Sequence, residues 1–384
     1  MKVLLAADFS SVHSRRYLEL ISSAGCEVIL LEKGRFPQIS GEFARRYHRW
    51  PRAGESILRY FAGRRLAEKI GSALVEIQLK LLWMRIKPDI CHVQWIDDKA
   101  RVLTRICVCP VILTAWGTDI RMCEFPSCDP LLRRRKSEAI SKAALLIADS
   151  NDITDIAKAL AQNSISTALI PFGIDTKLFR PGLQEERKGW RKELAIPETA
   201  TVALSPRLFR ARYGHHTIIS AFAHAIAKSQ CDAYLVLKRF DSDDPGYLNE
   251  VTAFVAHLGI EDRIRILDQL PYEKLPGYYA MGDFAINFPD YDAFPVTFME
   301  CFACQLPVLT KELPAYDSFG SRAYLRFTEA PTRNALERAI FTMLSECYSM
   351  KEQMAEARSF ACANFDETVV ARSLSQAYQN IVGR

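Results

Sequence analysis

The sequence lacks the long apolar runs of an integral membrane protein, since none of its hydrophobic segments reaches the roughly 20 residues that a membrane-spanning helix needs. Its N-terminal apolar run, Met1–Ala7, ends at Asp8 and is too short for the core of a signal peptide. A disulfide framework is missing as well, because the eleven cysteines are an odd number scattered through apolar segments. We therefore expect a soluble cytoplasmic protein with reduced thiols.

Glycine-rich phosphate-binding motifs of the Walker and dinucleotide types are also absent. The first predicted strand leads into Asp8-Phe-Ser-Ser-Val12 without clustered glycines. Metal-ligand spacing is missing too, because Cys301-Phe-Ala-Cys304 has no second pair of cysteines or histidines at ligand spacing and His215-His216 lacks a third ligand. We therefore expect neither a metal ion nor a cofactor.

The chain carries only a small excess of positive charge, +5 at neutral pH, which does not indicate a nucleic-acid partner. The excess is concentrated between Gly41 and Ile70, where eight Lys or Arg residues stand against three Glu. Because this segment is also rich in aromatic and aliphatic residues and partly helical in pattern, residues 43–70 fit a surface that contacts anionic membrane headgroups. A solvated helix face explains the composition equally well.

Short runs rich in Val, Ile and Leu alternate with stretches of helical period, which is the pattern of parallel sheets covered by helices on both faces. In the first half the predicted strands are Lys2–Ala7, Val28–Glu32, Asp89–Trp95, Pro110–Trp116, Ala144–Asp149 and Thr167–Pro171. In the second half they are Thr201–Pro206, Ala233–Lys238, Ile264–Leu267, Asp283–Phe288, Pro307–Thr310 and Tyr324–Phe327. The predicted fold class is therefore α/β, with two Rossmann-like parallel sheets.

The segment Gly173–Lys192 contains Pro, Gly and many charges and has the composition of a connector. It divides the chain into an N-terminal domain, residues 1–172, and a C-terminal domain, residues 173–366, while the last helix, within residues 367–384, fits either domain. Open α/β sheets bind ligands at the carboxyl ends of their strands. Two such sheets facing across a cleft offer one wall to each of two ligands, which suits group transfer.

The stretch from Asp283 to Thr310 is the most informative part of the sequence, and its order is strand, loop, helix, strand. Pro295 fits the first turn of the helix, where its missing N–H costs nothing. The backbone at this helix start is then free to bind an anion such as a diphosphate. The candidate contacts are Phe294, Pro295, Val296 and Thr297.

Two carboxylates frame the same helix. Asp292 lies in the loop before it and Glu300 lies inside it, with seven residues between them, so both side chains can reach one pocket from different depths. Carboxylates accept hydrogen bonds through paired oxygens and bind vicinal diols, which ribose and hexose both present. A donor with a ribose and a hexose presents two such diols, and the two carboxylates provide one acceptor group for each.

The pair Asp292 and Glu300 is followed by the turn Cys304-Gln305-Leu306-Pro307-Val308. Together they resemble the signature of the retaining GT-B glycosyltransferases of family 4, the glycosyl transferases group 1. Gln305 stands where the family has glycine. The segment Pro171–Pro181 resembles the interdomain crossing of the same family. The resemblance implies a GT-B fold whose C-terminal domain holds a nucleotide sugar. It also implies that Asp292 orients the sugar hydroxyls and that Glu300 binds the ribose.

The resemblance extends to Ser205–Phe222, which looks like the family's phosphate-binding turn, where an Arg and, five residues later, a Lys-Gly pair hold the diphosphate. Arg207 matches the Arg. Arg212 stands at the Lys spacing, although one residue separates it from the glycine, so Arg210 remains a competitor. Such cations stabilise the charge that develops on a departing diphosphate. Lys238, at the end of a predicted strand, is a further candidate contact with the nucleotide or an exposed side chain.

In the N-terminal half, Lys87–Trp95 and Thr114–Asp119 look like the family's two strand ends at the cleft. Many members carry His where this chain has Trp116, whose ring is suited to stack on a sugar. His13 follows the first strand, at a place where members often have a His near the transferred sugar. We therefore expect His13, Trp116 and Asp119 on the acceptor side.

The expected protein is a metal-independent, retaining hexosyltransferase with Arg207, Arg212 and Asp292 as catalytic residues. The expected partners are a UDP- or GDP-sugar and a glycan or lipid-linked acceptor of cell-surface polysaccharide or glycoconjugate synthesis. This activity belongs to the cytoplasm, at the inner face of the membrane. Two alternatives remain, a nucleotide-sugar epimerase of GT-B fold and a donor-binding protein without catalysis. The departures at Trp116, Tyr213 and Gln305 favour the donor-binding protein.

Overall fold

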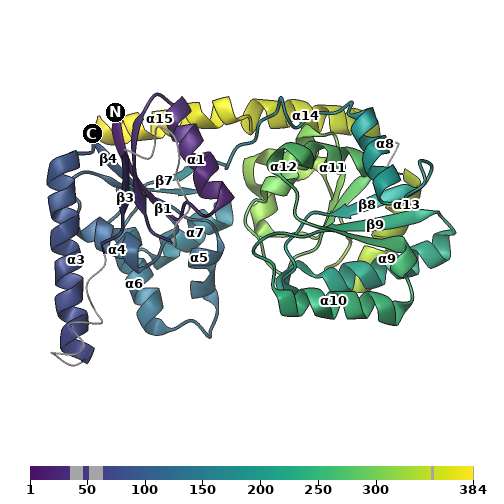
Figure 1. Cartoon of the computed structure of the whole chain (residues 1–384), viewed down its shortest axis with the longest axis horizontal. Helices are drawn as coiled ribbons and strands as arrows, with labels where there is room; N and C mark the ends of the chain where they lie inside the picture. The colour runs from purple at the N-terminus through teal and green to yellow at the C-terminus, as the bar shows by residue number, and fades with distance from the viewer. Residues whose placement is uncertain (35–45, 52–63, 347–349, 384) are drawn as a thin grey trace. The chain divides into compact units, whose positions relative to one another are not determined.

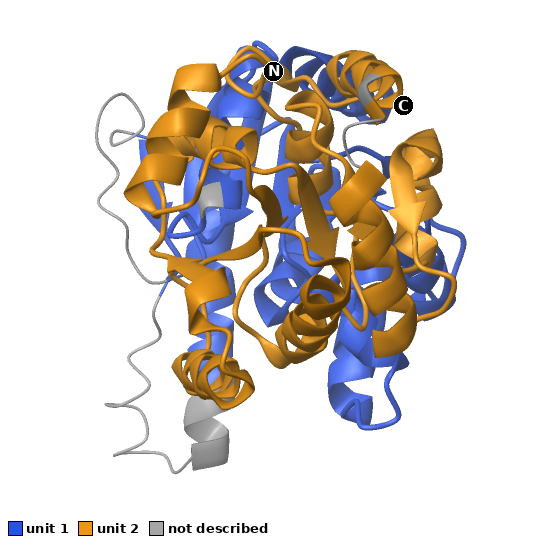
Figure 2. Cartoon of the chain, turned by 90° about the vertical axis from the view of Figure 1, so that its right-hand side faces the viewer, with its two compact units in different colours: residues 1–172, 368–384 blue, residues 173–367 orange. Residues whose placement is uncertain are grey.

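The structure of the chain is a computed structural model that describes residues 1–34, 46–51, 64–346 and 350–383. These residues form two compact units, which Figure 1 shows as ribbons and Figure 2 shows in separate colours. Unit 1 contains residues 1–172 and 368–384, and unit 2 contains residues 173–367. Each unit is an α/β domain built on a parallel sheet of Rossmann-like order.

The sheet of unit 1 has its strands in the order β3-β2-β1-β4-β5-β6-β7, and neighbouring strands are parallel. The strands are β1 (Lys2–Ala7), β2 (Glu27–Glu32), β3 (Tyr47–Arg49), β4 (Ile90–Gln94), β5 (Val111–Thr114), β6 (Leu145–Ala148) and β7 (Thr167–Leu169). The central strands are buried on both faces because helices cover them. The order reverses at β1, so the binding crevice of this sheet lies at the carboxyl ends of β1 and β4.

The sheet of unit 2 has the order β10-β9-β8-β11-β12-β13, again with parallel neighbours. The strands are β8 (Thr201–Ser205), β9 (Ala233–Lys238), β10 (Ile264–Leu267), β11 (Phe284–Asn287), β12 (Val308–Thr310) and β13 (Leu325–Phe327). The order reverses at β8. The crevice of this sheet therefore lies at the carboxyl ends of β8 and β11, by the same rule that applies to β1 and β4.

The helices of unit 1 include one from the far end of the sequence. They are α1 (Val12–Ser23), α3 (Arg64–Ile86), α4 (Asp98–Ile106), α5 (Thr118–Arg121), the short 3₁₀ turn η2 (Met122–Glu124), α6 (Pro130–Ser141), α7 (Asn151–Leu160) and α15 (Glu367–Val382). Leu374 and Tyr378 of α15 pack in the same buried cluster as Val3 and Ile90. The Tyr378 hydroxyl also lies 2.5 Å from Nδ1 of His92. The sequence left the position of this helix open, and the structure puts it on unit 1 (Figure 1).

Unit 2 alternates its strands with helices in the same way. They are α8 (Gln184–Glu193), α9 (His215–Ser229), α10 (Pro245–Leu258), α11 (Leu275–Met281), α12 (Val296–Ala303), α13 (Arg333–Glu346) and α14 (Lys351–Asn364). The 3₁₀ segments are η3 (Ala211–Tyr213), η4 (Glu261–Arg263), η5 (Tyr272–Lys274) and η6 (Pro314–Tyr324). One continuous buried cluster of apolar residues fills the space between these helices and the sheet.

Each of the twelve predicted strands is present, within two residues of its predicted ends. Two elements correct the sequence-based description. Tyr47–Arg49, in the segment expected to be partly helical, is the edge strand β3, and its three residues are too few to show a strand pattern. The second part of the predicted connector is helix α8. Its buried residue Arg191 anchors the helix by donating a hydrogen bond of 2.9 Å to Oδ2 of Asp283.

Three further expectations concern surfaces and thiols. Among the described residues, none of the helices combines the length and apolar composition needed to cross a membrane. The ten cysteines that the structure describes are free thiols, three of them buried. Within residues 43–70, the expected membrane-contacting segment, residues 43–45 and 52–63 lie outside the described residues, so that contact stays a prediction.

Candidate active site

In unit 2 the loops that follow β8 and β11 are tied together at the crevice. The backbone amide of Asp290 donates to the carbonyl oxygen of Arg212 at 2.7 Å. Gly214, with φ of +68°, approaches the end of β11 so closely that a Cβ would lie 2.6 Å from the carbonyl oxygen of Phe288. Only glycine combines this conformation with this contact. The loop of arginines after β8 is therefore held against the acidic loop after β11.

Arg207 and Asp292 form a largely buried ion pair at this crevice. Nη2 of Arg207 donates to Oδ1 of Asp292 at 2.9 Å, and the two side chains are 9% and 11% exposed. Burial is the largest influence on the pKa of Arg207 and lowers it, but Asp292, Tyr213 and Tyr316 together raise the pKa above its ordinary value. Nη1 of Arg207 lies 3.4 Å from Oγ1 of Thr297, in the first turn of α12. The charged guanidinium is thus held beside the start of that helix.

The second oxygen of Asp292 is held by a buried tyrosine. The hydroxyl of Tyr316 donates to Oδ2 of Asp292 at 3.1 Å and accepts from Nδ2 of Asn287 at 2.7 Å. Burial, and then the negative charge of Asp292, raise the pKa of Tyr316 well above its ordinary value, so the hydroxyl remains a donor. Both carboxylate oxygens of Asp292 are therefore fixed by side chains from other parts of unit 2.

Two arginines contact the ring of Tyr213. Its ring centroid lies 4.3 Å from the guanidinium carbon of Arg207 and 4.7 Å from that of Arg212. Nη2 of Arg212 also donates to the Tyr213 hydroxyl at 2.7 Å. Arg210 points elsewhere and donates to the carbonyl oxygen of Ser242 at 2.9 Å. Of the two candidates for the second phosphate-binding cation, the geometry favours Arg212, because it shares Tyr213 with Arg207.

Glu300 and Lys238 lie deeper in the same unit. Glu300 is 6% exposed and accepts a hydrogen bond from the hydroxyl of Tyr279 at 2.6 Å. Lys238, at the end of β9, is also buried, and its Nζ lies 3.1 Å from the ring centroid of Phe240. Burial lowers the pKa of Lys238 to about 8, against the opposing effect of the negative charge of Glu300. Lys238 is thus not the exposed side chain that the sequence also allowed.

The start of α12 differs from the expectation in one respect. Pro295 is the residue before the helix rather than part of its first turn, and the helix begins at Val296. Phe294 is 1% exposed and packs against Phe298, so its side chain belongs to the core. Of the four predicted phosphate contacts at this helix start, Phe294 and Pro295 are buried, whereas Val296 and Thr297 are only partly buried and keep accessible side chains.

The turn after α12 shows how Gln305 replaces the family's glycine. Gln305 has φ of +59°, in the left-handed region. The amide of Gln305 donates to the carbonyl oxygen of Phe302 at 3.1 Å, and that of Leu306 to Cys301 at 2.8 Å, which is the Schellman pattern of helix ends. The chain therefore keeps the turn, and with it the direction of α12, at a cost of roughly 1–2 kcal/mol for a side chain in this conformation.

In unit 1 the corresponding edge is aromatic. The ring of His13, at the start of α1, lies 5.4 Å from the Trp116 ring and 5.2 Å from the Phe172 ring. His13 itself is exposed, but desolvation of its ring, followed by the charge of Arg16, lowers its pKa to about 4. It is therefore neutral at neutral pH. The indole N–H of Trp116 is buried without a hydrogen-bond partner, which leaves a donor unused.

Trp95 extends this aromatic edge, although the sequence did not mark it as a site residue. It follows β4, is 41% exposed, and its ring lies 6.2 Å from that of Trp116. Its φ of +67° is unfavourable for an aromatic residue. Lys33 holds it there, because its Nζ donates to the carbonyl oxygen of Trp95 at 2.9 Å and pairs with Asp97 at 2.9 Å. Strain that is maintained in this way is typical of functional sites.

Asp119 is placed differently from the expectation of an acceptor contact. It is fully buried, and its carboxylate accepts from the amides of Ile96 at 2.9 Å and of Trp116 at 3.0 Å. Burial raises the pKa of Asp119, while these amides and the charge of Lys136 oppose that shift. Asp119 therefore joins the loops after β4 and β5 and positions the two tryptophans rather than lining the edge itself.

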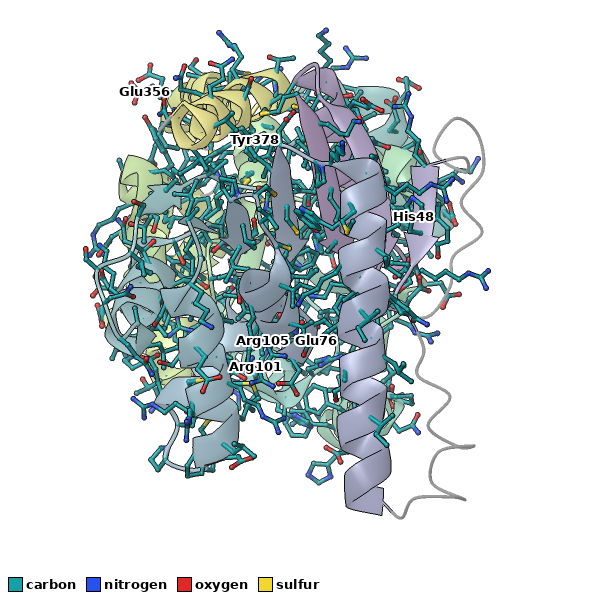
Figure 3. The ribbon with its side chains drawn as sticks, turned by 90° about the vertical axis from the view of Figure 1, so that its left-hand side faces the viewer. His48, Glu76, Arg101, Arg105, Glu356 and Tyr378 are labelled. Carbon is teal, nitrogen blue, oxygen red and sulfur yellow. The ribbon has the colours of Figure 1, made fainter. Side chains whose placement is uncertain are left out.

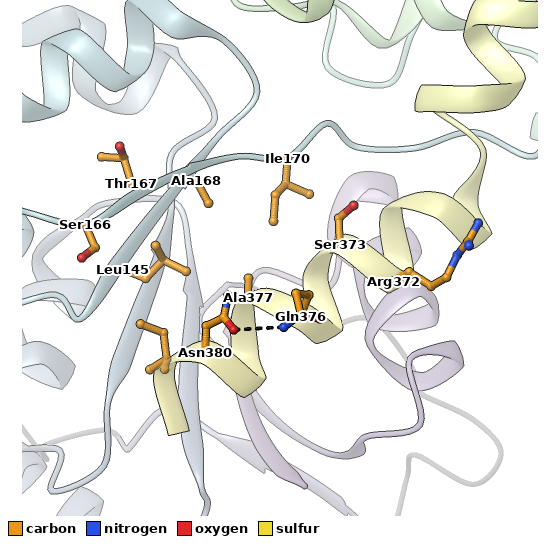
Figure 4. A pocket seen from close by; sticks show the side chains of 11 residues that line it. Leu145, Ser166, Thr167, Ala168, Ile170, Arg372, Ser373, Gln376, Ala377 and Asn380 are labelled. Atoms are coloured by element: carbon orange, nitrogen blue, oxygen red, sulfur yellow. Dashed lines mark hydrogen bonds between the residues drawn. The ribbon is translucent and has the colours of Figure 1, made fainter. Parts of the chain in front are cut away.

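Unit 1 also contains a groove of about 710 Å³ between β7 and α15 (Figure 4). It runs along β7 from Ser166 to Ile170, and Arg372 is the only charged residue in its lining. Because β5 and β6 separate β7 from β4, this groove is apart from the crevice. Within the described ranges, no group of three or more His, Cys, Asp or Glu side chains is arranged to hold a metal ion.

The partners that hold these residues were not predicted from the sequence. Tyr279, Tyr316 and Lys33 each reach a site residue from another element, and Asn287 donates to Tyr316. A buried tyrosine or asparagine has no local signature that distinguishes such a role from core packing. For Trp95 a signal did exist, since it is a large aromatic residue directly after a predicted strand, where ligands bind.

Two family models match the two halves of the chain. The model described as Glycosyl transferase 4-like matches residues 2–150, and the model described as Glycosyl transferases group 1 matches residues 186–358. The second match contains Arg207, Arg212, Asp292 and Glu300, which are the residues of the charged crevice in unit 2. Apart from Met1, the two matches leave out residues 151–185, which include α7 and β7 of unit 1, and the C-terminal residues 359–384.

Curated relatives are similar over parts of the chain. The D-inositol 3-phosphate glycosyltransferase of Corynebacterium diphtheriae is 26% identical over 252 residues, which are 63% of this chain and 57% of the relative. A GDP-mannose-dependent monoacylated alpha-(1-6)-phosphatidylinositol monomannoside mannosyltransferase of Corynebacterium glutamicum is 26% identical over 146 residues, 36% of this chain and 37% of the relative. The chain thus spans little more than half of the first relative's length and about a third of the other's.

Solved structures resemble the chain over its whole length. The sucrose-phosphate synthase of Thermosynechococcus elongatus has a TM-score of 0.78 at 16% identity, covering 100% of this chain and 99% of that one. HepE of Anabaena in complex with UDP-glucose has a TM-score of 0.75 at 15% identity, covering 99% and 100%. At these identities the likeness shows the fold, which is the GT-B arrangement of two Rossmann-like domains. With both family models and this fold in agreement, the chain belongs to the GT-B glycosyltransferases of the glycosyl transferases group 1.

Proposed function

We propose that the chain is a retaining hexosyltransferase that moves a sugar from a nucleotide donor, a UDP- or GDP-sugar, to a glycan or lipid-linked acceptor. The observation that carries the proposal is the buried Arg207–Asp292 pair, with Arg212 beside it, at the β8 and β11 crevice. HepE of Anabaena was solved with UDP-glucose, and the mannosyltransferase of Corynebacterium glutamicum depends on GDP-mannose. These names support the two donor classes.

The donor diphosphate binds between the arginines and the start of α12. Arg207 is held beside Thr297, so a phosphate at the first turn of the helix meets a guanidinium and the free backbone amides together. Breaking the glycosidic bond adds charge to the leaving diphosphate. Arg207 and Arg212 neutralise that charge without having to move, because Tyr213 and Asp292 fix them beforehand. In this proposal the arginines take the part that a metal ion plays in other transferases.

Asp292 and Glu300 bind hydroxyl groups of the donor. Asp292 is fixed at both oxygens by Arg207 and Tyr316, which leaves it suited to orient the hexose rather than to abstract a proton. Glu300, supported by Tyr279, binds the ribose. Because neither carboxylate is free as a base, the departing phosphate oxygen takes the acceptor proton. Attack then occurs on the face from which the diphosphate leaves, and the anomeric configuration is retained.

The acceptor binds at the aromatic edge of unit 1. Exposed Trp95 and partly buried Trp116 offer flat apolar faces to a sugar ring. Neutral His13 contributes a further polar group next to them. An acceptor with a lipid anchor places the reaction at the inner face of the membrane, in the synthesis of cell-surface polysaccharide or glycoconjugate.

A donor screen tests the proposal. Thermal unfolding is measured with UDP-, GDP- and CDP-sugars, and we expect one of the first two classes to raise the melting temperature, since a ligand at 100 times its Kd stabilises the folded state by about 2.7 kcal/mol. The Arg207→Ala variant should lose this shift, while the matched variant Arg210→Ala keeps it. Transfer is then followed with the selected donor, and product NMR gives the anomeric configuration. Conversion of the donor into its epimer without an acceptor would sink the transferase proposal.

A further inference from the structure

The outer face of α3 carries a line of large apolar side chains. They are Ile70, Leu74, Ile77, Leu81 and Met84, and each is between 37% and 68% exposed. Their spacing of four, three, four and three residues puts them on one narrow line of the helix. Single exposed apolar residues are normal on a protein surface, but a continuous line over about four turns marks an interaction site.

The opposite face of α3 fixes the helix to unit 1. Leu79 and Ile86 are buried, half a turn away from the apolar line. Glu76 forms an ion pair with Arg105 of α4, and Figure 3, which looks onto α3, shows these two side chains next to each other. The apolar line is therefore displayed on a helix that its other face holds in position.

The charge beside the line has one sign. Between Ile70 and Ile86 the only acidic residue is Glu76, which is paired with Arg105. Lys80 and Arg85 are exposed, and their positions in the helical period put them on opposite sides of the apolar line. Side chains of this kind lay their alkyl stems along an apolar surface and keep their charged ends in a polar layer.

A second copy of the chain fits this face poorly. If two α3 helices packed along their apolar lines, a parallel pair would bring Lys80 of one helix to Arg85 of the other. An antiparallel pair would bring each cation to its own counterpart. With no unpaired acid on this stretch of sequence, like charges would face each other in both arrangements. An anionic surface compensates both cations instead.

We propose that α3 is a membrane-docking helix that lies in the plane of an anionic lipid surface. Its apolar line enters the boundary between headgroups and acyl chains, and Lys80 and Arg85 meet the lipid phosphates. Docking of this kind holds unit 1, with its aromatic edge, at the membrane. That last consequence rests on the proposed lipid-linked acceptor, whereas docking itself does not.

Vesicle flotation of the full-length protein tests the proposal. We expect binding to vesicles of phosphatidylcholine with phosphatidylglycerol, weaker binding to pure phosphatidylcholine, and a decrease with salt. Leu74→Glu with Leu81→Glu should lower the partition coefficient at least about tenfold, because two charges replace apolar contacts with the bilayer. The matched control is Val108→Glu, since Val108 is 91% exposed and lies outside α3.

Three outcomes overturn the proposal. The first is a wild-type protein that stays with the soluble fraction, and the second is a double variant that binds vesicles as well as the wild type does. The third is a wild-type dimer in light scattering that the double variant converts into monomers, which would assign α3 to a second copy of the chain. Melting temperatures with and without the nucleotide sugar, measured on the same samples, report on folding and on the transferase proposal separately.

Discussion

The two units share a sheet topology and differ in the chemistry at the equivalent edge. In both, the strand order reverses at the first strand, β1 in unit 1 and β8 in unit 2. The loops after β8 and β11 supply Arg207 and Asp292, which form a hydrogen-bonded ion pair. The loops after β1 and β4 lead to His13 and Trp95, an aromatic edge. Topology thus decides where a ligand binds, and the residues that follow each strand decide which ligand.

The two edges also differ in how they are held. In unit 2 the fixed parts are side chains, since Asp292 is engaged at both oxygens and Tyr213 supports two cations. In unit 1 the fixed part is the backbone, because Lys33 and Asp119 bind main-chain groups around the two tryptophans. A charged transition state requires groups that are rigid beforehand. A neutral sugar ring requires an accessible aromatic face, so the two kinds of support match the two proposed ligands.

The contrast between the two units would be lost if the Arg207–Asp292 pair of unit 2 were dispensable for transfer. Asp292→Asn keeps the size of the side chain but removes its charge, and we expect kcat to fall by at least about a thousandfold with the fold retained. Steady-state transfer and circular dichroism measure the two properties. Arg210→Ala, in the same loop as Arg207 but bonded to Ser242, serves as the control and should stay within about threefold of the wild type. Equal effects of both substitutions would contradict the assignment.

The support of Asp292 is tested by Tyr316→Phe. This substitution removes the hydroxyl that donates to Asp292 and leaves the buried amide of Asn287 without its acceptor. We expect a loss of about 1–3 kcal/mol in the free energy of unfolding and about tenfold in kcat. Urea unfolding and transfer kinetics provide the two values. A variant that loses stability but keeps kcat would show that Tyr316 contributes to folding and not to the function of Asp292.

The aromatic edge gives a smaller and different signature. Trp95→Ala should raise the KM for the acceptor about fivefold, which corresponds to the loss of one aromatic contact, and leave the donor-induced rise in melting temperature unchanged. Arg212→Ala should reduce the donor-induced rise in melting temperature and leave the KM for the acceptor unchanged. If Trp95→Ala weakened the donor and spared the acceptor, the assignment of the two units to two ligands would be wrong.

The smallest expected effect concerns Gln305. Replacing it by glycine relieves a φ of +59°, and we expect the free energy of unfolding to rise by about 1 kcal/mol with kcat unchanged within about twofold. Thermal and urea unfolding measure the gain. A loss of stability would mean that the Gln305 side chain makes contacts that outweigh its strained backbone.

The fold was largely predictable because parallel strands are buried on both faces and therefore read as apolar runs. Tyr47–Arg49 was missed because an edge strand of three residues carries no such run. Among the site residues, Arg207 and Asp292 follow strands and keep their family spacing, so their position was accessible from the sequence. Whether Arg210 or Arg212 lies beside Arg207 depends on a turn geometry that spacing alone does not contain.

Other features had no signal in the sequence. The positive φ of Trp95 results from Lys33, which is 62 residues away in the chain. Asp119 looked like a cleft residue because it follows a strand, yet backbone amides take both of its oxygens. Phe294 stood beside the predicted phosphate site, but its side chain packs in the core. In each case a contact between distant segments decided the role.

The return of α15 to unit 1 has a consequence for synthesis on the ribosome. Unit 2 is one uninterrupted stretch, residues 173–367, so all of it has been translated before α15 is complete. Unit 1 still lacks Leu374 and Tyr378 at that moment, and its cluster around Val3 and Ile90 remains uncovered. Domains tend to fold as units as they leave the ribosome. The second unit can therefore finish folding before the first, although it follows most of the first in the sequence.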